Sequence, residues 1–364
     1  MKFLFFSGHA HLALDPYSEA SSGGAELQVA LLSRELVKRG HQVTLLAAET
    51  GQCDGVVWEG IKVRTGGGFD TGKIFDTVLA LPKIIKVISE EKPDAIIVYG
   101  WTSLLYFLAK LRSLIKYRLI FVCALDSEID GRFFCTNPLR GYFFKKGMHA
   151  CDVRFGITEH QAKLFRQQEM KCDVMRLLLQ DPMISKVKPL EKKEIDLLWV
   201  ARCNVVKQPL LFLDLAERLP EARCQMICSA QDKKLWQRVK DKAALLSNVE
   251  FLETVPYRHI QHHFDRAKVF VNTSLDEGVP NTFIHSGLGE AAIASLRVDP
   301  DKMFEQFQAG ICAQNDFEQL VTGMRSLLQD EPSLTFAQQE AARFVKTWHN
   351  NEKNVDVFLE GIEL

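Results

Sequence analysis

The sequence has no long hydrophobic run. No apolar stretch reaches the roughly 20 residues that a membrane-spanning helix needs. The apolar start, residues 1–6, is too short for the hydrophobic region of a signal peptide, and Ser7-Gly8-His9 follows it at once. We therefore expect residues 1–6 to form a buried first strand rather than a leader or an anchor.

The cysteines do not form the pattern of a small secreted disulfide framework. The chain has 9 cysteines, an odd number, and they are scattered. None of their spacings matches a zinc site. We therefore expect reduced thiols in a cytoplasmic protein.

The chain also has little net charge. Lys and Arg number 45 against 46 Asp and Glu, so the net charge is −1, and the overall charge does not indicate a nucleic-acid partner. The 364 residues are 47% hydrophobic and 25% charged. This composition suffices for a large buried core, and the length indicates two domains.

Short apolar runs alternate with helical stretches through the first half. The predicted strands are residues 1–6, 41–47, 61–64, 95–99 and 119–124, and the predicted helices are residues 25–38, 73–88 and 104–114. Buried strands that alternate with helices predict a parallel, doubly wound sheet.

The same pattern restarts after residues 189–194, a charged stretch with a proline that we interpret as a linker. The predicted strands are residues 195–200, 224–228, 249–252, 268–272 and 291–294, and the predicted helices are residues 209–218, 233–246, 257–266 and 281–288. The expected fold class is therefore α/β, with two doubly wound domains. Ligands of such sheets lie beyond the carboxyl ends of the strands, so we expect the site in a cleft between the domains.

The strongest candidate site is a loop between a predicted strand and helix of the second half. It contains Glu277, Gly278 and Val279, and the helix opens near Asn281-Thr282. The backbone N–H groups and the dipole of a helix start favour a phosphate, and Glu277 is placed to accept hydrogen bonds from sugar hydroxyls. The alternative is an ordinary loop with Asn281 or Thr282 as the helix cap.

Two cations flank the first loop of the second half. Arg202 and Lys207 lie between the predicted strand 195–200 and the predicted helix 209–218. Arginine grips phosphate with a planar fork, and lysine adds a mobile point charge. Two solvated surface cations are the alternative, which the presence of the Glu277 loop in the same domain makes weaker.

This combination resembles a known family. Arg202 and Lys207 together with Glu277-Gly278-Val-Pro-Asn-Thr-Phe resemble the donor site of the retaining GT-B glycosyltransferases of family 4. Further similar motifs are Ser22-Gly23-Gly24-Ala25-Glu26, Phe251-Leu252, Val255-Pro256 and Val298-Asp-Pro-Asp301. The resemblance implies two Rossmann-like domains facing a cleft, with a final helix that crosses back to the first domain.

The resemblance also implies a domain plan and an activity. It implies an acceptor domain at residues 1–188, a domain for the nucleotide sugar at residues 189–335, and C-terminal helices at residues 336–364 that pack on the first domain. The implied reaction moves a sugar from a nucleoside-diphosphate sugar to a glycan or lipid-linked acceptor, with retention and without a required metal or other cofactor. It fits polysaccharide or glycolipid assembly in the cytoplasm or at the inner face of the membrane. A nucleotide-sugar epimerase of the same fold and a non-catalytic nucleotide- or glycan-binding partner subunit stay open as alternatives.

The resemblance assigns roles residue by residue. Arg202 and Lys207 bind the diphosphate and stabilise the charge that develops on the leaving group. Glu277 holds the donor sugar, and Gly23 and Gly24 let the backbone approach the donor. The remaining donor-binding positions are Gly278, Val279, Asn281, Thr282 and His285.

Three positions depart from the family pattern, and one of them is Glu290, where the family usually has a small residue near the end of the helix. Eight positions after Glu277 the family has a second glutamate, and this sequence has His285. A neutral imidazole offers a ribose fewer acceptors than a carboxylate, so we expect weakened donor binding. We also expect an affinity that changes across roughly pH 5.5–7.5. The family often has a histidine after the predicted strand 119–124, and Asp126 is the nearest match in this sequence. Asp126 is either an acceptor-side catalytic group or a loop carboxylate that caps a helix.

Other candidates carry less weight. Asp299 and Asp301 resemble a metal-binding pair of another glycosyltransferase fold, but we interpret them as a loop and a helix cap. His9 and His11 follow the first strand and are either acceptor contacts or loop residues. The basic and aromatic residues at 140–146 fit either peripheral contact with a membrane surface or a half-buried helix.

Overall fold

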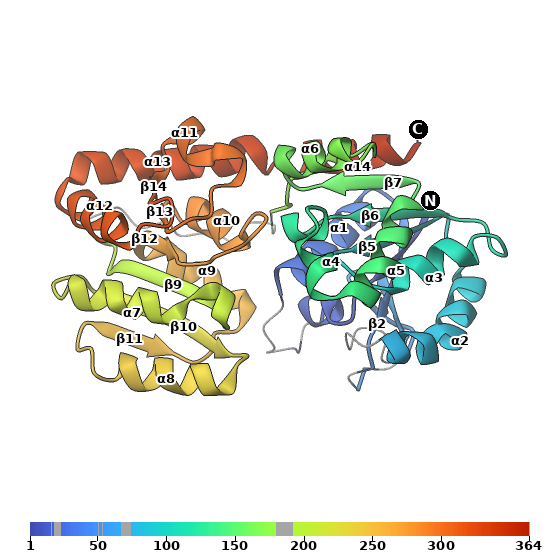
Figure 1. The fold of residues 1–364 in the computed structure, drawn as a ribbon, viewed down its shortest axis with the longest axis horizontal. Coiled ribbons are helices and arrows are strands. Elements are labelled where there is room, and N and C mark those ends of the chain that lie inside the picture. The colour runs from blue at the N-terminus through green and yellow to red at the C-terminus, as the bar shows by residue number, and fades with distance from the viewer. Residues whose placement is uncertain are drawn as a thin grey trace. The chain divides into compact units, whose positions relative to one another are not determined.

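The computed structural model describes residues 1–15, 17, 23–49, 51–52, 54–66, 74–179 and 192–363. Ser22 of the glycine motif, Lys73 of an expected helix and residues 189–191 of the expected linker lie outside these ranges. Contacts within the chain divide it into two compact units (Figure 1). The first unit is Met1–Leu178 with Asn351–Leu364, and the second is Leu179–Asn350.

The first unit is built on a parallel sheet. Its strands are β1 (Lys2–Phe6), β2 (Gln42–Ala47), β3 (Val56–Trp58), β4 (Ile61–Thr65), β5 (Ala95–Tyr99), β6 (Arg118–Val122), β7 (Val153–Gly156) and β8 (Asp173–Val174). The described strands lie in the order β3-β4-β2-β1-β5-β6-β7-β8, and every neighbouring pair is parallel except β3 with β4. Because β1 is central, Phe3 lies opposite both Val43 and Ala95.

Helices surround this first sheet. The α-helices are α1 (Gly24–Lys38), α2 (Ile74–Glu91), α3 (Leu104–Leu111), α4 (Arg132–Thr136), α5 (Pro138–His149), α6 (Glu159–Gln167) and α14 (Asn351–Glu363), and the 3-10 helices are η1 (Ala10–Ala13) and η2 (Asp126–Glu128). Helices on both faces explain why Phe3, Leu4 and Phe5 are all buried in β1.

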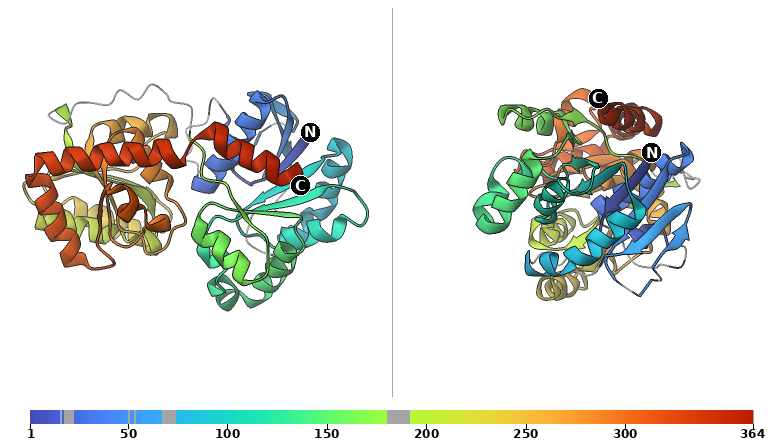
Figure 2. Two further views of the ribbon diagram at one scale, coloured as in Figure 1. Left: turned by 90° about the horizontal axis from the view of Figure 1, so that it is seen from above. Right: turned by 90° about the vertical axis from the view of Figure 1, so that its right-hand side faces the viewer.

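The C-terminal helix α14 completes the first unit. It packs against α1, β7 and β8, and Figure 2 shows it in red beside the N-terminal elements in blue. The buried ring of Phe358 lies 5.2 Å from the ring of Phe155 and 6.2 Å from that of Phe3, centroid to centroid. Gly361 lies so close to Phe155 that a Cβ there would stand 2.8 Å from its ring, which fixes the position of α14.

The second unit has a fully parallel sheet. Its strands are β9 (Ile195–Cys203), β10 (Cys224–Ala230), β11 (Val249–Leu252), β12 (Ala267–Asn272), β13 (Ala292–Ser295) and β14 (Gly310–Cys312), in the order β11-β10-β9-β12-β13-β14. The helices are η4 (Val205–Lys207), α7 (Pro209–Arg218), α8 (Lys233–Ala243), α9 (Tyr257–Asp265), α10 (Asn281–Leu288), η5 (Pro300–Lys302), α11 (Met303–Phe307), α12 (Phe317–Gln329) and α13 (Glu331–Trp348).

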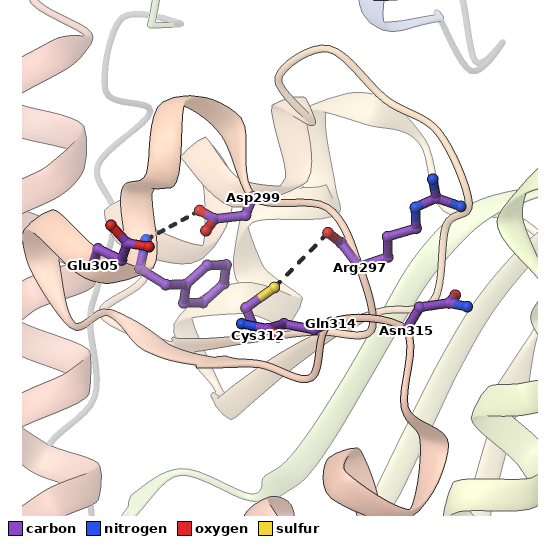
Figure 3. A pocket seen from close by; sticks show the side chains of 7 residues that line it. Arg297, Asp299, Glu305, Cys312, Gln314 and Asn315 are labelled. Atoms are coloured by element: carbon purple, nitrogen blue, oxygen red, sulfur yellow. Dashed lines mark hydrogen bonds between the residues drawn. The ribbon is translucent and has the colours of Figure 1, made fainter.

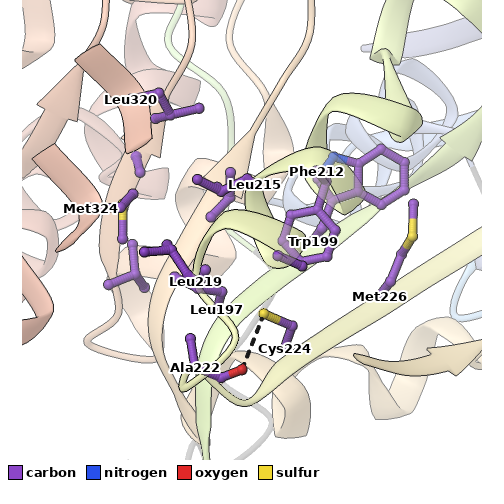
Figure 4. Close-up of a cluster of buried hydrophobic side chains, with 14 of the residues drawn as sticks. Leu197, Trp199, Phe212, Leu215, Leu219, Ala222, Cys224, Met226, Leu320 and Met324 are labelled. Carbon is purple, nitrogen blue, oxygen red and sulfur yellow. Dashed lines mark hydrogen bonds between the residues drawn. The ribbon is translucent and has the colours of Figure 1, made fainter. Parts of the chain in front are cut away.

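A cluster of buried side chains from this sheet and from α7 and α12 forms the core of the second unit (Figure 4). The indole of Trp199, on β9, stacks on the ring of Phe212, on α7, with centroids 6.3 Å apart. Both side chains are almost completely buried. This core fixes the first strand and first helix of the unit, and so fixes the ends of the loop between them.

The alternation of strands and helices predicted from the sequence is confirmed, and its boundaries differ in places. Helices 209–218 and 281–288 and strand 249–252 have the predicted bounds. The helix predicted for residues 104–114 ends at Leu111, and the one predicted for 233–246 ends at Ala243. The helical stretch at residues 336–364 is divided: α13 buries its side chains in the second unit, packing on α10 and β13, and α14 belongs to the first.

No helix in the described part of the chain is long and apolar enough to cross a membrane.

Candidate active site

The second sheet brings two predicted site loops to the same edge. Because its strands are parallel, the loops that follow β9 and β12 both leave the carboxyl edge of the sheet. Lys207 ends the short helix η4 after β9, and Glu277 lies in the loop between β12 and α10. The Lys207 ammonium forms an ion pair with Glu277 Oε1. The structure therefore joins two residues that lie 70 positions apart in the sequence.

Glu277 is held in a defined position. Its Oε1 accepts a hydrogen bond of 2.8 Å from Ser274 Oγ, and Asn272 Nδ2 donates to the same oxygen at 3.5 Å. The Glu277 side chain is 16% exposed and that of Lys207 is 24% exposed. The pair is therefore partly shielded from water, where its attraction is stronger than on an open surface, but it can still be reached by a ligand.

The backbone around Lys207 is tied to the second loop. Thr273, at the end of β12, accepts from Trp199 Nε1 at 2.9 Å and donates to the carbonyls of Lys207 at 2.7 Å and Gln208 at 3.1 Å. Leu275 N also donates to the Val206 carbonyl at 2.8 Å. We call this set of contacts the Thr273 brace. It makes the two loops one hydrogen-bonded unit anchored on the buried Trp199.

Arg202 differs from Lys207 in its surroundings. It lies near the end of β9, opposite Ser229 of β10, and its side chain is exposed. Within the described part of the chain no ion pair or hydrogen bond engages its guanidinium. The site thus offers one cation that is already paired with a carboxylate and one that is available to an incoming anion.

Helix α10 begins beside this ion pair. Its first residue is Asn281 and its cap is Pro280, which makes no side-chain cap hydrogen bond. The expected alternative, with Asn281 or Thr282 as the cap, is therefore wrong, because proline occupies that position and has no side-chain acceptor. Gly278 and Val279 are buried directly before it. The positive end of the helix dipole therefore lies at this edge of the sheet, with no side-chain cap from Pro280.

His285 lies on the second turn of α10 and is buried, with 7% of its surface exposed. Burial lowers the pKa of its imidazole to about 4. The prediction that titration of His285 changes the affinity across roughly pH 5.5–7.5 is therefore wrong, because the imidazole is neutral throughout that interval. Its ring nitrogens contact Tyr257 Oη at 3.2 Å and Gln261 Oε1 at 2.8 Å. Neither residue has a sequence signal that would have linked it to His285.

The remaining predicted residues belong to the first unit. Gly23 caps α1 with extended backbone, and Gly24 is the first residue of that helix. Asp126 begins η2 at the carboxyl edge of the first sheet, and its Oδ2 lies 3.6 Å from Nε2 of His160, on α6. Sequence reasoning did not find this neighbour, because His160 follows the next strand. It supplies an imidazole beside the loop where the family often has one.

A second carboxyl group near Asp126 was also missed. Glu128 is 1% exposed, and burial raises its pKa to about 7. It accepts hydrogen bonds from Trp101 N at 3.2 Å and from Ala124 N at 2.9 Å. Glu128 therefore ties the loop after β5 to the loop after β6 and fixes the turn that carries Asp126.

Asp299 occupies the N-cap position of η5, where its side chain makes no cap hydrogen bond to that helix. Its Oδ1 accepts from Phe304 N at 3.2 Å, in the first turn of α11, and burial raises its pKa. Among the described residues no group of three or more His, Cys, Asp or Glu side chains could hold a metal ion. A shallow hollow of about 700 Å³ lies beside Asp299 at the ends of β13 and β14 (Figure 3). Its other lining residues are Arg297, Phe304, Glu305, Cys312, Gln314 and Asn315.

The other predicted contacts have mixed surroundings. His9 is exposed, whereas His11 is 1% exposed and burial lowers its pKa. In α5 the Arg140 guanidinium lies 4.2 Å from the ring centre of Trp101. Phe144 is buried in the core, and Tyr142 is 57% exposed. Residues 140–146 therefore form a half-buried helix that keeps an aromatic and basic outer face.

Two doubly wound units are the architecture of the GT-B fold, and comparison with known families identifies the class of protein as a glycosyltransferase. Residues 22–173 match the family model described as Glycosyltransferase Family 4, and residues 194–330 match the one described as Glycosyl transferases group 1. Because the two models follow one another over most of the chain, the chain belongs to the glycosyltransferases that they describe.

Solved structures support the fold over the whole chain. Sucrose-phosphate synthase from Thermosynechococcus elongatus is similar with a TM-score of 0.81 and 13% identity, covering 99% of this chain and 98% of that one. A UDP-forming α,α-trehalose-phosphate synthase from Burkholderia xenovorans has a TM-score of 0.69 and 14% identity, covering 100% and 98%. UDP-GlcNAc 2-epimerase from Neisseria meningitidis, bound to UDP-GlcNAc, has a TM-score of 0.67 and 10% identity, covering 100% and 99%. No curated protein sequence matches the chain.

Proposed function

We propose that the protein transfers a glycosyl group from a nucleoside-diphosphate sugar to an acceptor hydroxyl, with retention, in polysaccharide or glycolipid assembly. The observation that carries the proposal is the ion pair of Lys207 with Glu277 beside the start of α10, with Arg202 exposed at the same edge. Among proteins of similar fold, the one from B. xenovorans is UDP-forming and the one from N. meningitidis is bound to UDP-GlcNAc. The first description names a nucleoside diphosphate as product and the second names a bound nucleotide sugar, the class of compound that we propose as donor.

The cationic and the anionic residues of the site have different roles. Arg202 and Lys207 bind the diphosphate and stabilise the negative charge that grows on it as the glycosidic bond to the donor breaks. Glu277, held by Lys207 and Ser274, accepts hydrogen bonds from hydroxyls of the transferred sugar. Because this carboxylate is already oriented in the free protein, less ordering is required when the donor binds.

The acceptor side is proposed on the first unit. Asp126 is the candidate polar group there, and Gly23 and Gly24 give the backbone of α1 close access to the donor. The outer face of α5, with the exposed Tyr142, is the proposed contact with the membrane surface when the acceptor is lipid-linked. Binding to anionic vesicles that is lost in a variant with glutamate in place of Lys145 and Lys146 would support this contact, and unchanged binding would contradict it.

We also propose that the reaction needs no divalent metal, because two cations and a helix start already supply a positive field at the diphosphate. Turnover measured in EDTA is expected to equal turnover in Mg²⁺ or Mn²⁺. Turnover that disappears in EDTA and returns with either metal would contradict the proposal and make Asp299 and Asp301 candidate ligands again.

One experiment tests the proposed activity against its alternatives. The protein is incubated with a panel of nucleotide sugars, with and without glycan and lipid-linked acceptors, and nucleotide release and sugar products are followed by NMR. A transferase releases nucleotide only when an acceptor is present, and the anomeric coupling of its product reports retention. Conversion of the donor sugar without an acceptor indicates an epimerase, and binding without any conversion indicates a non-catalytic partner.

The variant Lys207→Ala is expected to remove that turnover. A matched control is Arg238→Ala, which removes an exposed cation of α8 in the same unit. Equal losses in both variants would contradict the assignment of the site.

A further inference from the structure

His285 is hydrogen-bonded within the protein through both of its ring nitrogens. Nδ1 lies 2.8 Å from Gln261 Oε1, and Nε2 lies 3.2 Å from Tyr257 Oη. Its ring also stacks on Phe264, with centroids 5.4 Å apart. The imidazole therefore links α9 to α10 and does not itself present a polar atom to a ligand.

The hydrogen bonds of Gln261 fix which nitrogen carries the proton. Gln261 Nε2 donates to Asp265 Oδ1 at 2.9 Å and to the His285 carbonyl at 3.1 Å, so the amide oxygen must face His285. An amide oxygen only accepts, and therefore Nδ1 of the neutral imidazole is the donor. Nε2 is then an acceptor, and the Tyr257 hydroxyl must donate to it.

Tyr257 stands at the same edge of the sheet as the candidate diphosphate site. It is the first residue of α9, which follows β11, and helices that follow parallel strands begin at the carboxyl edge. Helical side chains lean toward the start of their helix, so the half-buried Tyr257 side chain leans toward this edge. Its ring meets the ring of His285 edge-on, at 70° and 5.7 Å between centroids.

Lys207 pairs with Glu277, in the loop directly before α10, so a nucleoside diphosphate bound at Lys207 lies beside the start of that helix, and its ribose is attached to the diphosphate. His285 holds a polar group on the α9 side of this helix start. That group is the hydroxyl of Tyr257. A phenol oxygen that donates its proton can still accept hydrogen bonds through its lone pairs, and ribose hydroxyls are donors.

We infer that Tyr257 contacts the ribose of the bound nucleotide, and that His285 is a positioning residue that holds the Tyr257 hydroxyl in place. The inference rests on the proposed function, because it needs a nucleoside diphosphate at the Lys207 site. The contact of Tyr257 with the ribose hydroxyls makes the protein prefer ribonucleotides to nucleotides that lack these hydroxyls.

Calorimetry with three probes tests the inference. The probes are the tightest binder among UDP, GDP and ADP, its 2′,3′-dideoxy analogue, and inorganic pyrophosphate. The wild-type protein is expected to bind the ribonucleotide about threefold to tenfold more tightly than the dideoxy analogue, which is the effect of one neutral hydrogen bond. Tyr257→Phe keeps the ring and is expected to bind the two nucleotides equally. Pyrophosphate binding is expected to stay unchanged.

A second variant tests the role of His285. His285→Leu is expected to show the same loss as Tyr257→Phe, and the double variant no further loss, because both changes remove one coupled contact. The matched control is His259→Leu, an exposed histidine of α9. Nitrogen chemical shifts of His285 supply an independent readout: the Nδ1–H form is expected in the free protein, with a changed Nε2 signal in Tyr257→Phe.

The outcomes separate the inference from the function beneath it. Ribonucleotide preference that persists in Tyr257→Phe, or a wild-type protein that binds nucleoside diphosphates without that preference, overturns the inference and leaves the proposed function standing. Preference that is lost in Tyr257→Phe but kept in His285→Leu overturns the positioning role. A wild-type protein that binds none of the three nucleoside diphosphates overturns the proposed function, and the inference with it.

Discussion

Arg202 and Lys207 carry the same charge in the candidate site but lie in different surroundings. Lys207 is paired with Glu277 and partly shielded, whereas Arg202 is exposed. A ligand that binds at Lys207 must share this cation with a carboxylate, and a ligand that binds at Arg202 does not. We therefore expect Arg202 to make the larger direct contribution to anion affinity.

The variant Arg202→Ala tests this expectation. Loss of a charge-assisted hydrogen bond is expected to weaken nucleoside-diphosphate binding about 10- to 150-fold. Calorimetry on wild type, Arg202→Ala and the control Arg238→Ala checks it. Unchanged affinity in Arg202→Ala together with unchanged affinity in Lys207→Ala would remove the diphosphate assignment.

The burial of His285 predicts a pH dependence of stability. Its pKa is about 4 in the folded protein against an ordinary value of 6.5, so the unfolded chain binds more protons between these values. The free energy of unfolding is therefore expected to fall as the pH drops from 6.5 toward 4, by about 2 kcal/mol between pH 7 and pH 5 from this group.

Urea unfolding of wild type and His285→Gln at both pH values measures this contribution. The variant is expected to lose part of the pH dependence and to keep the rest, because burial also lowers the pKa of His263 to about 4. His259→Gln is the exposed control and is expected to keep the wild-type profile. Identical profiles for wild type and His285→Gln would contradict the buried, neutral imidazole.

At the scale of elements, the Thr273 brace holds the loop after β9 against the loop after β12. Thr273→Val keeps the shape of the side chain but leaves Trp199 Nε1 and two carbonyls without this partner. The expected cost is about 1–3 kcal/mol of unfolding free energy. Nucleotide affinity is also expected to fall about 2- to 30-fold. Thr273 touches no ligand in the proposed site, but its loss releases the backbone that carries Lys207.

The control for the brace is Thr322→Val, on α12, whose hydroxyl donates to carbonyls of its own helix. Thermal unfolding and calorimetry are measured for both variants. If Thr273→Val loses stability but binds nucleotide with wild-type affinity, the brace supports the core and does not position Lys207.

Local sequence patterns predicted some helices and strands and not others. Helix α7 was predicted with its bounds because Pro209 marks its start and its apolar residues repeat at helical spacing. Strand β14 was missed because Gly310–Cys312 is short, only half-buried and at the edge of the sheet. Patterns within a few residues predict an element, but a short edge strand depends on its neighbour.

The candidate site was also predicted from the sequence only in part. The types of Arg202, Lys207 and Glu277 and their place after strands indicated a phosphate and sugar site, since parallel strands gather such loops at one edge. The environment of His285 could not be predicted, because its partners Gln261 and Tyr257 lie 24 and 28 positions away on another helix. Burial and partners across helices are set by packing, and a sequence motif does not contain them.

At the scale of the whole molecule, the first unit depends on a helix from the other end of the chain. Phe358→Ala removes a buried ring that contacts Phe3 and Phe155. The expected loss is about 3–5 kcal/mol of unfolding free energy, confined to the first unit. Hydrogen exchange is expected to rise in β1 and β7 and to stay unchanged in β9 and β12.

The control is Phe336→Ala, which removes a ring of α13 that is 48% exposed. Exchange that rises equally in both units of Phe358→Ala would contradict two separate packing units.

The place of α14 also has a consequence for the order in which the molecule is made. The second unit is one continuous stretch of chain, so it can complete its fold as soon as its last helix leaves the ribosome. The first unit begins to be synthesised earlier but receives α14 last, so the apolar surface around Phe155 stays uncovered while the whole second unit is being translated. Of the two units, the one whose synthesis begins earlier is therefore expected to finish folding later.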